Sequence, residues 1–122
     1  MILLARFHGI FVSEDIVALD AFVPRLVQSD GPTRGILDFT QVTVIAVPLT
    51  RLVERARKPE LVPGSQRIIV APDPEVFELG RMFQSYQELS GNTVPQVVLS
   101  LEDAYAAMGV TGLDFEPVDF NR

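Results

Sequence analysis

The sequence predicts an α/β fold in which about four helices cover a mainly parallel sheet of four or five strands. Four apolar runs alternate along the chain with four segments of helical periodicity, which is the pattern of consecutive β-α-β units. The chain is 48% hydrophobic and 21% charged, a composition that suits a buried core. Its 122 residues are enough for one such core and too few for two. We therefore expect a single domain over residues 1–110, followed by an acidic tail over residues 111–122.

The first β-α unit begins with an apolar run at residues 2–8, which is typical of a strand. Ser13 offers an N-cap for the helix that follows, and the apolar residues after it recur at helical spacing. Pro24 interrupts this spacing. It predicts a kink or a break near Val23, because proline lacks the backbone donor that a regular helix uses.

The middle of the chain predicts a second strand and a short helix. Residues 36–39 form a short apolar run that is typical of a buried strand. Residues 42–47 are rich in β-branched side chains and are expected to be extended, either as a strand or as a loop that crosses the edge of the core. A helix with a clear apolar stripe then begins at Pro48 and ends at Pro59.

One edge of this short helix is basic. Arg51, Arg55 and Lys58 lie at positions i, i+4 and i+7, and Arg57 is close by. Cations near the C-terminus of a helix complement its dipole, and their long stems cover apolar neighbours. The alternative interpretation is that an acidic partner or ligand docks on this edge.

The rest of the chain repeats the pattern of strand and helix. The expected elements are strands at 68–71 and 97–99 and helices at 74–89 and 101–108. Asp73 is the expected N-cap of the first of these helices. Ser100 is the expected N-cap of the helix at 101–108, where Asp103 completes an approximate capping box. Gly109 is expected to end the last helix.

Charge and residue types restrict the possible functions. Ten basic residues against sixteen acidic ones give a net charge of −6, which disfavours binding to nucleic acid or to an anionic membrane surface. Cysteine is absent and His8 is the only histidine, which removes thiol catalysis, disulfides and multi-histidine metal sites. No apolar run is long enough to span a bilayer, and Arg6 cuts the apolar start short. We expect a cytoplasmic protein without metal and, because nucleotide-binding motifs are absent, without cofactor.

Polar residues at the carboxyl ends of the expected strands are candidates for a polar site. Ligands of open α/β sheets usually bind beyond these ends, where the sequence places His8, Asp38, Thr40, Asp73 and Ser100. Helix capping explains Asp73 and Ser100. Hydrogen bonds to backbone amides of the next loop explain Asp38, and a solvated turn explains His8. The alternative is a polar site formed by Asp38, Thr40 and Asp73.

The helix expected at residues 74–89 has more apolar surface than one face of a sheet can cover. Its apolar arc is wider than the stripe of about 100° that packs against a sheet. The excess is covered by a second copy of the chain, by an apolar ligand in a groove, or by the acidic tail with Phe115 and Phe120. The residues expected at this interface or groove are Phe77, Met82, Phe83 and Tyr86.

Three short motifs occur in the order found in a known family. They are Gly9 followed by Ser13-Glu14-Asp15, then Ile36-Leu37-Asp38-Phe39-Thr40, and finally Glu102-Asp103-Ala104. Over about residues 2–109 the chain resembles the STAS domains of bacterial anti-sigma-factor antagonists, and more closely their uncharacterised relatives of similar length. The resemblance implies a bacterial protein-interaction module regulated at a serine after the second strand. The corresponding residues 46–48 are Ala-Val-Pro and carry no hydroxyl group.

Three functions follow from these observations, in order of preference. The first is a non-enzymatic, regulatory STAS-like interaction module that forms a homodimer through the helix at 74–89. The second is a carrier that holds a small apolar ligand or lipid in a groove between this helix and the sheet, in line with the likeness of some STAS relatives to lipid-carrier domains. The third is a hydrolase-type enzyme that uses Asp38, Asp73 and His8.

Overall fold

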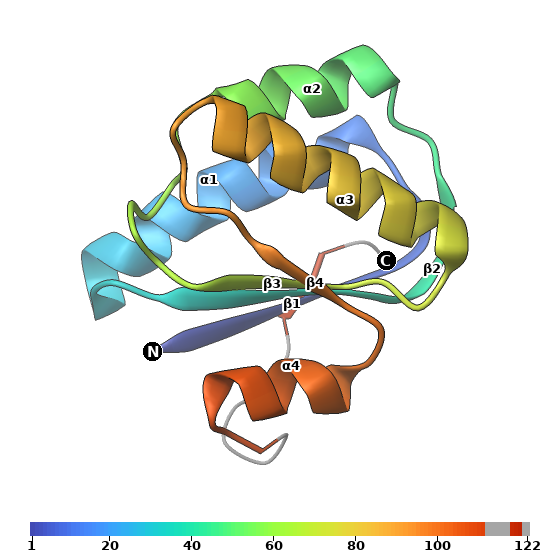
Figure 1. Cartoon of the computed structure of the whole chain (residues 1–122). Helices are drawn as coiled ribbons and strands as arrows, with labels where there is room; N and C mark the ends of the chain where they lie inside the picture. Colours follow the sequence, from blue (N-terminus) through green and yellow to red (C-terminus); the bar gives the residue numbers. More distant parts are fainter. Residues whose placement is uncertain (112–117, 121–122) are drawn as a thin grey trace.

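The computed structural model describes residues 1–111 and 118–120, and within that part of the chain it confirms the predicted α/β class (Figure 1). Five parallel strands form one sheet in the order β4-β3-β2-β1-β5. None of the helices described has the length and apolar character needed to cross a bilayer. The elements are β1 (Ile2–Phe11), α1 (Ser13–Asp30), β2 (Arg34–Ile45), α2 (Leu49–Arg57), β3 (Arg67–Val70), α3 (Pro74–Leu89), β4 (Gln96–Val98), α4 (Leu101–Met108) and β5 (Val118–Asp119).

The helices are divided between the two faces of the sheet. α1, α2 and α3 cover one face, and α4 lies on the other (Figure 1). This division follows from the strand order, because β2, β3 and β4 are each added on the same side of the previous strand. Right-handed crossovers between parallel strands then leave the three connecting helices on one face.

The strand register determines which side chains share a face. Leu3, Gly35 and Arg67 are cross-strand neighbours in one row. The next row, which begins with Leu4 and Ile36, packs against α4. Because side chains alternate along a strand, the row of Leu3, Gly35 and Arg67 faces the layer of α1, α2 and α3.

Of the kink or break predicted near Val23, the break is wrong, because α1 is continuous from Ser13 to Asp30. Val23 is buried in the core, and this packing keeps the helix intact although Pro24 removes one of its hydrogen bonds. Pro24 itself is exposed, so its ring does not disturb the packing against the sheet.

The start of α1 also differs from the prediction. Ser13 is the first helical residue rather than the N-cap, and the N-cap is Val12, whose side chain has no acceptor. Asp15 compensates, because its Oδ2 accepts a hydrogen bond of 2.8 Å from the N–H of Val12. The carboxylate lies where the helix dipole favours negative charge.

β2 extends well beyond the strand predicted at residues 36–39. Of the two interpretations of residues 42–47, the strand holds as far as Ile45, because Val42 and Val44 pair with β1. The pairing of β1 with β2 shifts register twice, between Arg6 and His8 and between Gly9 and Ile10, as β-bulges do. The helix expected to begin at Pro48 begins one residue later, with Pro48 as its N-cap.

Three predicted helix ends are confirmed. Asp73 Oδ1 accepts a hydrogen bond of 2.9 Å from the N–H of Glu75 at the start of α3. Ser100 Oγ accepts one of 3.1 Å from the N–H of Asp103 at the start of α4. Gly109 ends α4 with a φ of 69°, a left-handed conformation that glycine adopts without strain.

Part of the predicted acidic tail pairs with the sheet, since Val118–Asp119 form β5 beside β1. The ring centroid of Phe120 lies 5.5 Å from that of Phe7 on β1 and 5.5 Å from that of Phe22 on α1. Of the two tail phenylalanines considered as a cover for α3, Phe120 therefore packs against β1 and α1. Phe115 lies outside the described residues.

Candidate functional site

Polar residues of β1, β2 and β5 form a cluster on the face of the sheet that α4 covers, and Arg6 and Asp38 lie near the middle of their strands. Asp38 is fully buried, and its Oδ1 accepts a hydrogen bond of 2.8 Å from the N–H of Thr40. Its Oδ2 lies 3.5 Å from Nε of Arg6. Asp119 is the neighbour of Arg6 on β5, and its Oδ1 lies 3.6 Å from Nε2 of His8. The structure thus brings Asp38 and His8 together with an arginine and a second carboxylate.

Asp73 acts at the start of α3 instead. Its Oδ1 accepts hydrogen bonds from the N–H groups of Glu75 and Val76, at 2.9 and 3.3 Å. The capping interpretation of Asp73 is therefore confirmed. Asp38 also bonds a backbone amide as expected, but it does so within β2 rather than in a loop, because this strand continues to Ile45.

The four apolar residues predicted on α3 are all half-buried. Phe77 and Phe83 pack against a buried cluster formed by β3 and the start of α3. Tyr86 is covered by α2, since the guanidinium carbon of Arg57 lies 5.5 Å from the centroid of its ring. α2 therefore covers part of the apolar arc, and the homodimer through Phe77 and Met82 stays a prediction.

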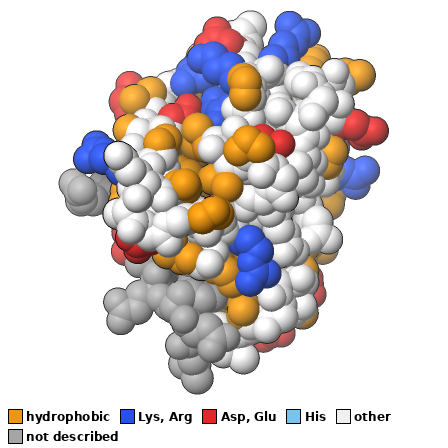
Figure 2. All heavy atoms as spheres, turned by 90° about the vertical axis from the view of Figure 1, so that its left-hand side faces the viewer, with side chains coloured by type: hydrophobic (Ala, Val, Ile, Leu, Met, Phe, Trp, Pro, Cys, Tyr) orange, Lys and Arg blue, Asp and Glu red, His pale blue; other side chains and the backbone are white. Residues whose placement is uncertain are grey.

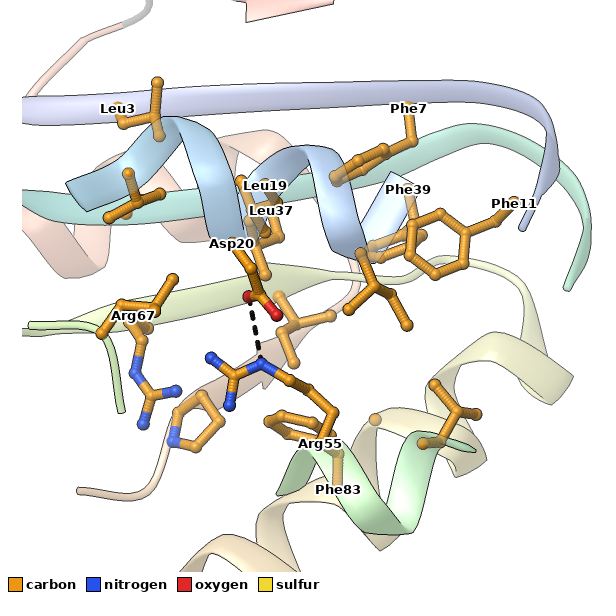
Figure 3. A pocket seen from close by; sticks show the side chains of 18 of the residues that line it. Leu3, Phe7, Phe11, Leu19, Asp20, Leu37, Phe39, Arg55, Arg67 and Phe83 are labelled. Carbon is orange, nitrogen blue, oxygen red and sulfur yellow. Dashed lines mark hydrogen bonds and ion pairs between the residues drawn. The ribbon is translucent and has the colours of Figure 1, made fainter. Parts of the chain in front are cut away.

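A cavity of about 200 Å³ lies between the sheet and the layer of α1, α2 and α3 (Figure 3). Its walls are almost entirely apolar and come from the first three strands and all three helices. The side chains labelled in Figure 3 include Leu3, Phe7, Leu37 and Phe39 from the sheet and Leu19 and Phe83 from the helices. α3 also contributes Val76, Leu79 and Gly80, so the cavity lies where the sequence suggests a groove.

Gly35 helps to leave this volume empty. It lies between Leu3 and Arg67 in a row that faces the helices, but it has no side chain. A Cβ atom at this position would meet nothing within 4 Å, so there is room for a larger residue. Gly80 on α3 is the opposite case, because a Cβ atom there would lie 3.2 Å from the methyl groups of Val97. Gly80 lets α3 approach β4, whereas Gly35 leaves space above β2.

Charged side chains gather at one end of the cavity (Figure 3). Asp20 on α1 and Arg55 on α2 form an ion pair, with 3.0 Å between Asp20 Oδ1 and Arg55 Nε. Arg67 lines the same cavity as the first residue of β3. Its Nη2 donates to the carbonyl of Thr93 and lies 3.4 Å from Oε2 of Glu60. The candidate site is therefore an apolar cavity with a charged rim.

This rim lies at the amino ends of β2 and β3, whereas the sequence analysis placed candidate residues at the carboxyl ends. Figure 2 shows the side of the molecule that includes the amino ends of the strands, where hydrophobic side chains gather at the centre and charged ones surround them. Leu61 lines the cavity and is 37% exposed. The wall of the cavity at Leu61 therefore forms part of the molecular surface.

Two groups near the rim have shifted pKa values. Burial raises the pKa of Glu60, but hydrogen bonds from Thr93 and from the backbone of Gly64, together with the charge of Arg67, outweigh burial and lower it. The pKa of Arg67 is lowered, mainly because burial disfavours its charge. Glu60 opposes this shift, and the positive charge of Arg55 adds to it.

Replacing Glu60 by glutamine is expected to destabilise the protein by about 1 to 2 kcal/mol near neutral pH. Because its pKa is lower in the folded state, the carboxylate stabilises the fold above its unfolded-state pKa of about 4.3. This contribution is lost as the pH falls through the folded-state value. Urea unfolding of wild type and variant at about pH 7 and pH 3 measures the difference, which should shrink at the lower pH.

The exposed Glu54 provides the matched control for this experiment. Glu54→Gln should change the free energy of unfolding by less than about 0.5 kcal/mol at either pH, because exposed ion pairs contribute little. If Glu60→Gln lowers the free energy of unfolding by the same amount at both pH values, the charge of Glu60 does not stabilise the segment between α2 and β3.

Sequence reasoning found only part of this site. Arg55 belongs to the basic helix edge for which a ligand was the alternative interpretation, and Phe83 is a predicted groove residue that lines the cavity. Asp20, Gly35 and Arg67 were missed, because none of them belongs to a recognisable motif. The available signal was Gly35 beside an apolar strand, since glycine in a strand often marks a close approach of a ligand or of another backbone.

Comparisons with known proteins leave the family open. No protein-family model matches the chain, and no curated protein sequence matches it. The resemblance to STAS domains therefore stays a prediction, and the function has to be argued from the geometry of the cavity.

Proposed function

We propose that this protein binds a small apolar molecule in the cavity between the sheet and α1, α2 and α3. The observation that carries the proposal is about 200 Å³ of empty volume with almost entirely apolar walls. An engineered cavity of about 150 Å³ lined by leucine, isoleucine and phenylalanine binds benzene. The volume here therefore suits a ligand of about six to eight carbon atoms.

The energetic cost of an empty cavity supports this proposal. Protein interiors are close-packed, and voids larger than a water molecule are few. A closed apolar cavity costs about 24 cal/mol per Å³, because its lining side chains lose packing contacts, and a cavity that is open on one side loses part of the same contacts. A ligand that fills the cavity restores the missing contacts.

The apolar walls of the cavity suit a protein that carries or senses such a molecule. Apolar walls hold a ligand through buried area and dispersion contacts. For an eight-carbon alcohol, contacts of this kind give a Kd of roughly 0.1 mM.

Gly35→Phe tests the proposal, because position 35 faces the cavity and has open space around it. We expect octan-1-ol to shift the methyl NMR signals of Leu19 and Leu37 in the wild-type protein, since both residues line the cavity. The phenyl ring occupies part of the same volume, so the variant should bind octan-1-ol about tenfold more weakly. Filling the void should also raise the melting temperature of the variant.

Gly35→Ala is the matched control, since it adds one methyl group and leaves most of the cavity open. It should bind octan-1-ol nearly as well as the wild-type protein. The proposed function is wrong if octan-1-ol leaves the methyl signals of the wild-type protein unchanged up to its solubility limit, or if Gly35→Phe binds it equally well.

A further inference from the structure

We propose that the ligand carries an anionic oxygen group, with an alkyl carboxylate of medium length as its chemical class, and that Arg67 and Arg55 hold this group at the charged end of the cavity. This inference rests on the proposed function and specifies the chemistry of the ligand.

The charged residues along the cavity are mostly basic, although the protein is acidic. Among the described lining residues, Arg34, Arg55 and Arg67 stand against one carboxylate, that of Asp20, while the whole chain carries a net charge of −6. Arg34 is engaged on the α4 side, where its Nη1 donates to the carbonyl of Met108. Arg55 and Arg67 are therefore the two cations that can receive an anion.

Arg67 has a donor that the described protein groups leave unused. Its Nη2 donates to Thr93 and Glu60, but its Nε is shielded from solvent and has no acceptor within the described ranges. A buried charged donor without an acceptor is destabilising and rare in native proteins. A carboxylate oxygen beside Nε accepts a charge-assisted hydrogen bond from it, which is about twice as strong as one between neutral groups.

Arg55 adds a second positive charge at the same end. Its side chain is 13% exposed, and its Nε donates to Oδ1 of Asp20 at 3.0 Å. The positive charge of Arg55 lowers the pKa of Arg67, which means that the two guanidinium groups repel each other. An anion placed beside them relieves this repulsion, whereas an ammonium group increases it. The site should therefore prefer a carboxylate to an alcohol, and an alcohol to an amine.

The sheet provides a path for the alkyl chain. Beyond the row of Gly35 and Arg67, the next positions of β2 that line the cavity are Leu37 and Phe39. The strand from Gly35 to Phe39 spans about 13 Å. In Figure 3, Leu37 lies between Arg67 and Phe39, so a carboxylate beside Arg67 would place the alkyl chain along β2 toward the ring of Phe39.

Three probes with the same eight-carbon chain test the charge preference. Octanoate, octan-1-ol and octylammonium are titrated into the wild-type protein at about pH 7 and low salt, and the methyl signals of Leu19 and Leu37 are followed. We expect octanoate to bind about tenfold more tightly than octan-1-ol. Octylammonium should bind more weakly than octan-1-ol. Added salt should reduce the advantage of octanoate and leave octan-1-ol unaffected.

Two arginine variants then test whether Arg67 causes the preference for octanoate over octan-1-ol. Arg67→Gln should weaken octanoate binding about tenfold and leave octan-1-ol binding unchanged. Arg81→Gln removes an exposed arginine of α3 that does not line the cavity, and it should change neither affinity.

The outcomes separate this inference from the proposed function. If octanoate binds no more tightly than octan-1-ol, or if Arg67→Gln weakens both probes equally, the carboxylate inference is wrong and the apolar cavity stands. If none of the probes binds, the proposed function is wrong as well. Should Arg67→Gln fail to fold, the ranking of the three probes on the wild-type protein still decides the inference.

Discussion

Replacing Phe7 by alanine is expected to lower the free energy of unfolding by about 4 kcal/mol. Phe7 is 1% exposed and lies at the centre of an aromatic cluster. The centroid of its ring is 5.0 Å from that of Phe11, 5.1 Å from that of Phe39 and 5.5 Å from that of Phe120. Truncation removes a fully buried ring and its edge and stacking contacts. It also enlarges the cavity that Phe7 already lines, which increases the loss.

Urea unfolding of the two proteins measures this difference, and Phe77→Ala is the matched control. Phe77 is a half-buried phenylalanine of α3 outside the aromatic cluster, and its truncation should cost about 2 kcal/mol or less. If the two variants lose equal stability, the cluster around Phe7 is not the centre of the core.

Replacing Arg6 by methionine is expected to lower the free energy of unfolding by about 2 to 3 kcal/mol. The change keeps a long side chain but removes the charge that lies 3.5 Å from Oδ2 of Asp38. That oxygen is buried and has no hydrogen-bond donor among the groups that the structure describes, so the variant leaves a buried negative charge without its partner. The loss is smaller than for a fully buried pair because Arg6 is 35% exposed.

A double-mutant cycle with Asp38→Asn separates the ion pair from other effects of the Arg6 substitution. Asparagine removes the charge but retains an oxygen that accepts the hydrogen bond from the N–H of Thr40. The double variant should therefore lose less stability than the sum of the two single variants, by about 1 kcal/mol or more. Strictly additive losses would show that Arg6 and Asp38 do not stabilise each other.

The helix ends show why some features of this protein were predictable. Asp73 and Ser100 cap α3 and α4 through backbone amides two or three residues away, and Gly109 ends α4 through its own conformation. Both partners of each such interaction lie within one turn of helix. A short stretch of sequence therefore contains all the information that the interaction needs.

Pro24 and β2 show where local reasoning failed. Proline predicts a break in an isolated helix, but α1 is held in place by residues such as Val23 that pack into the core. Residues 42–45 become strand because β1 lies beside them and supplies hydrogen-bond partners. In both cases the deciding contacts come from residues far away in the sequence.

The sequence by itself determined the α/β class, the order of elements along the chain as far as α4, and the helix ends at Asp73, Ser100 and Gly109, because periodicity and capping are properties of neighbouring residues. The tertiary structure alone decided the candidate site. Asp20, Arg55 and Arg67 belong to three different elements, and the empty volume above Gly35 exists only once the helices lie over the sheet. A cavity results from how separate elements fail to fill the space between them, and neither its size nor its charged rim is encoded in any single segment.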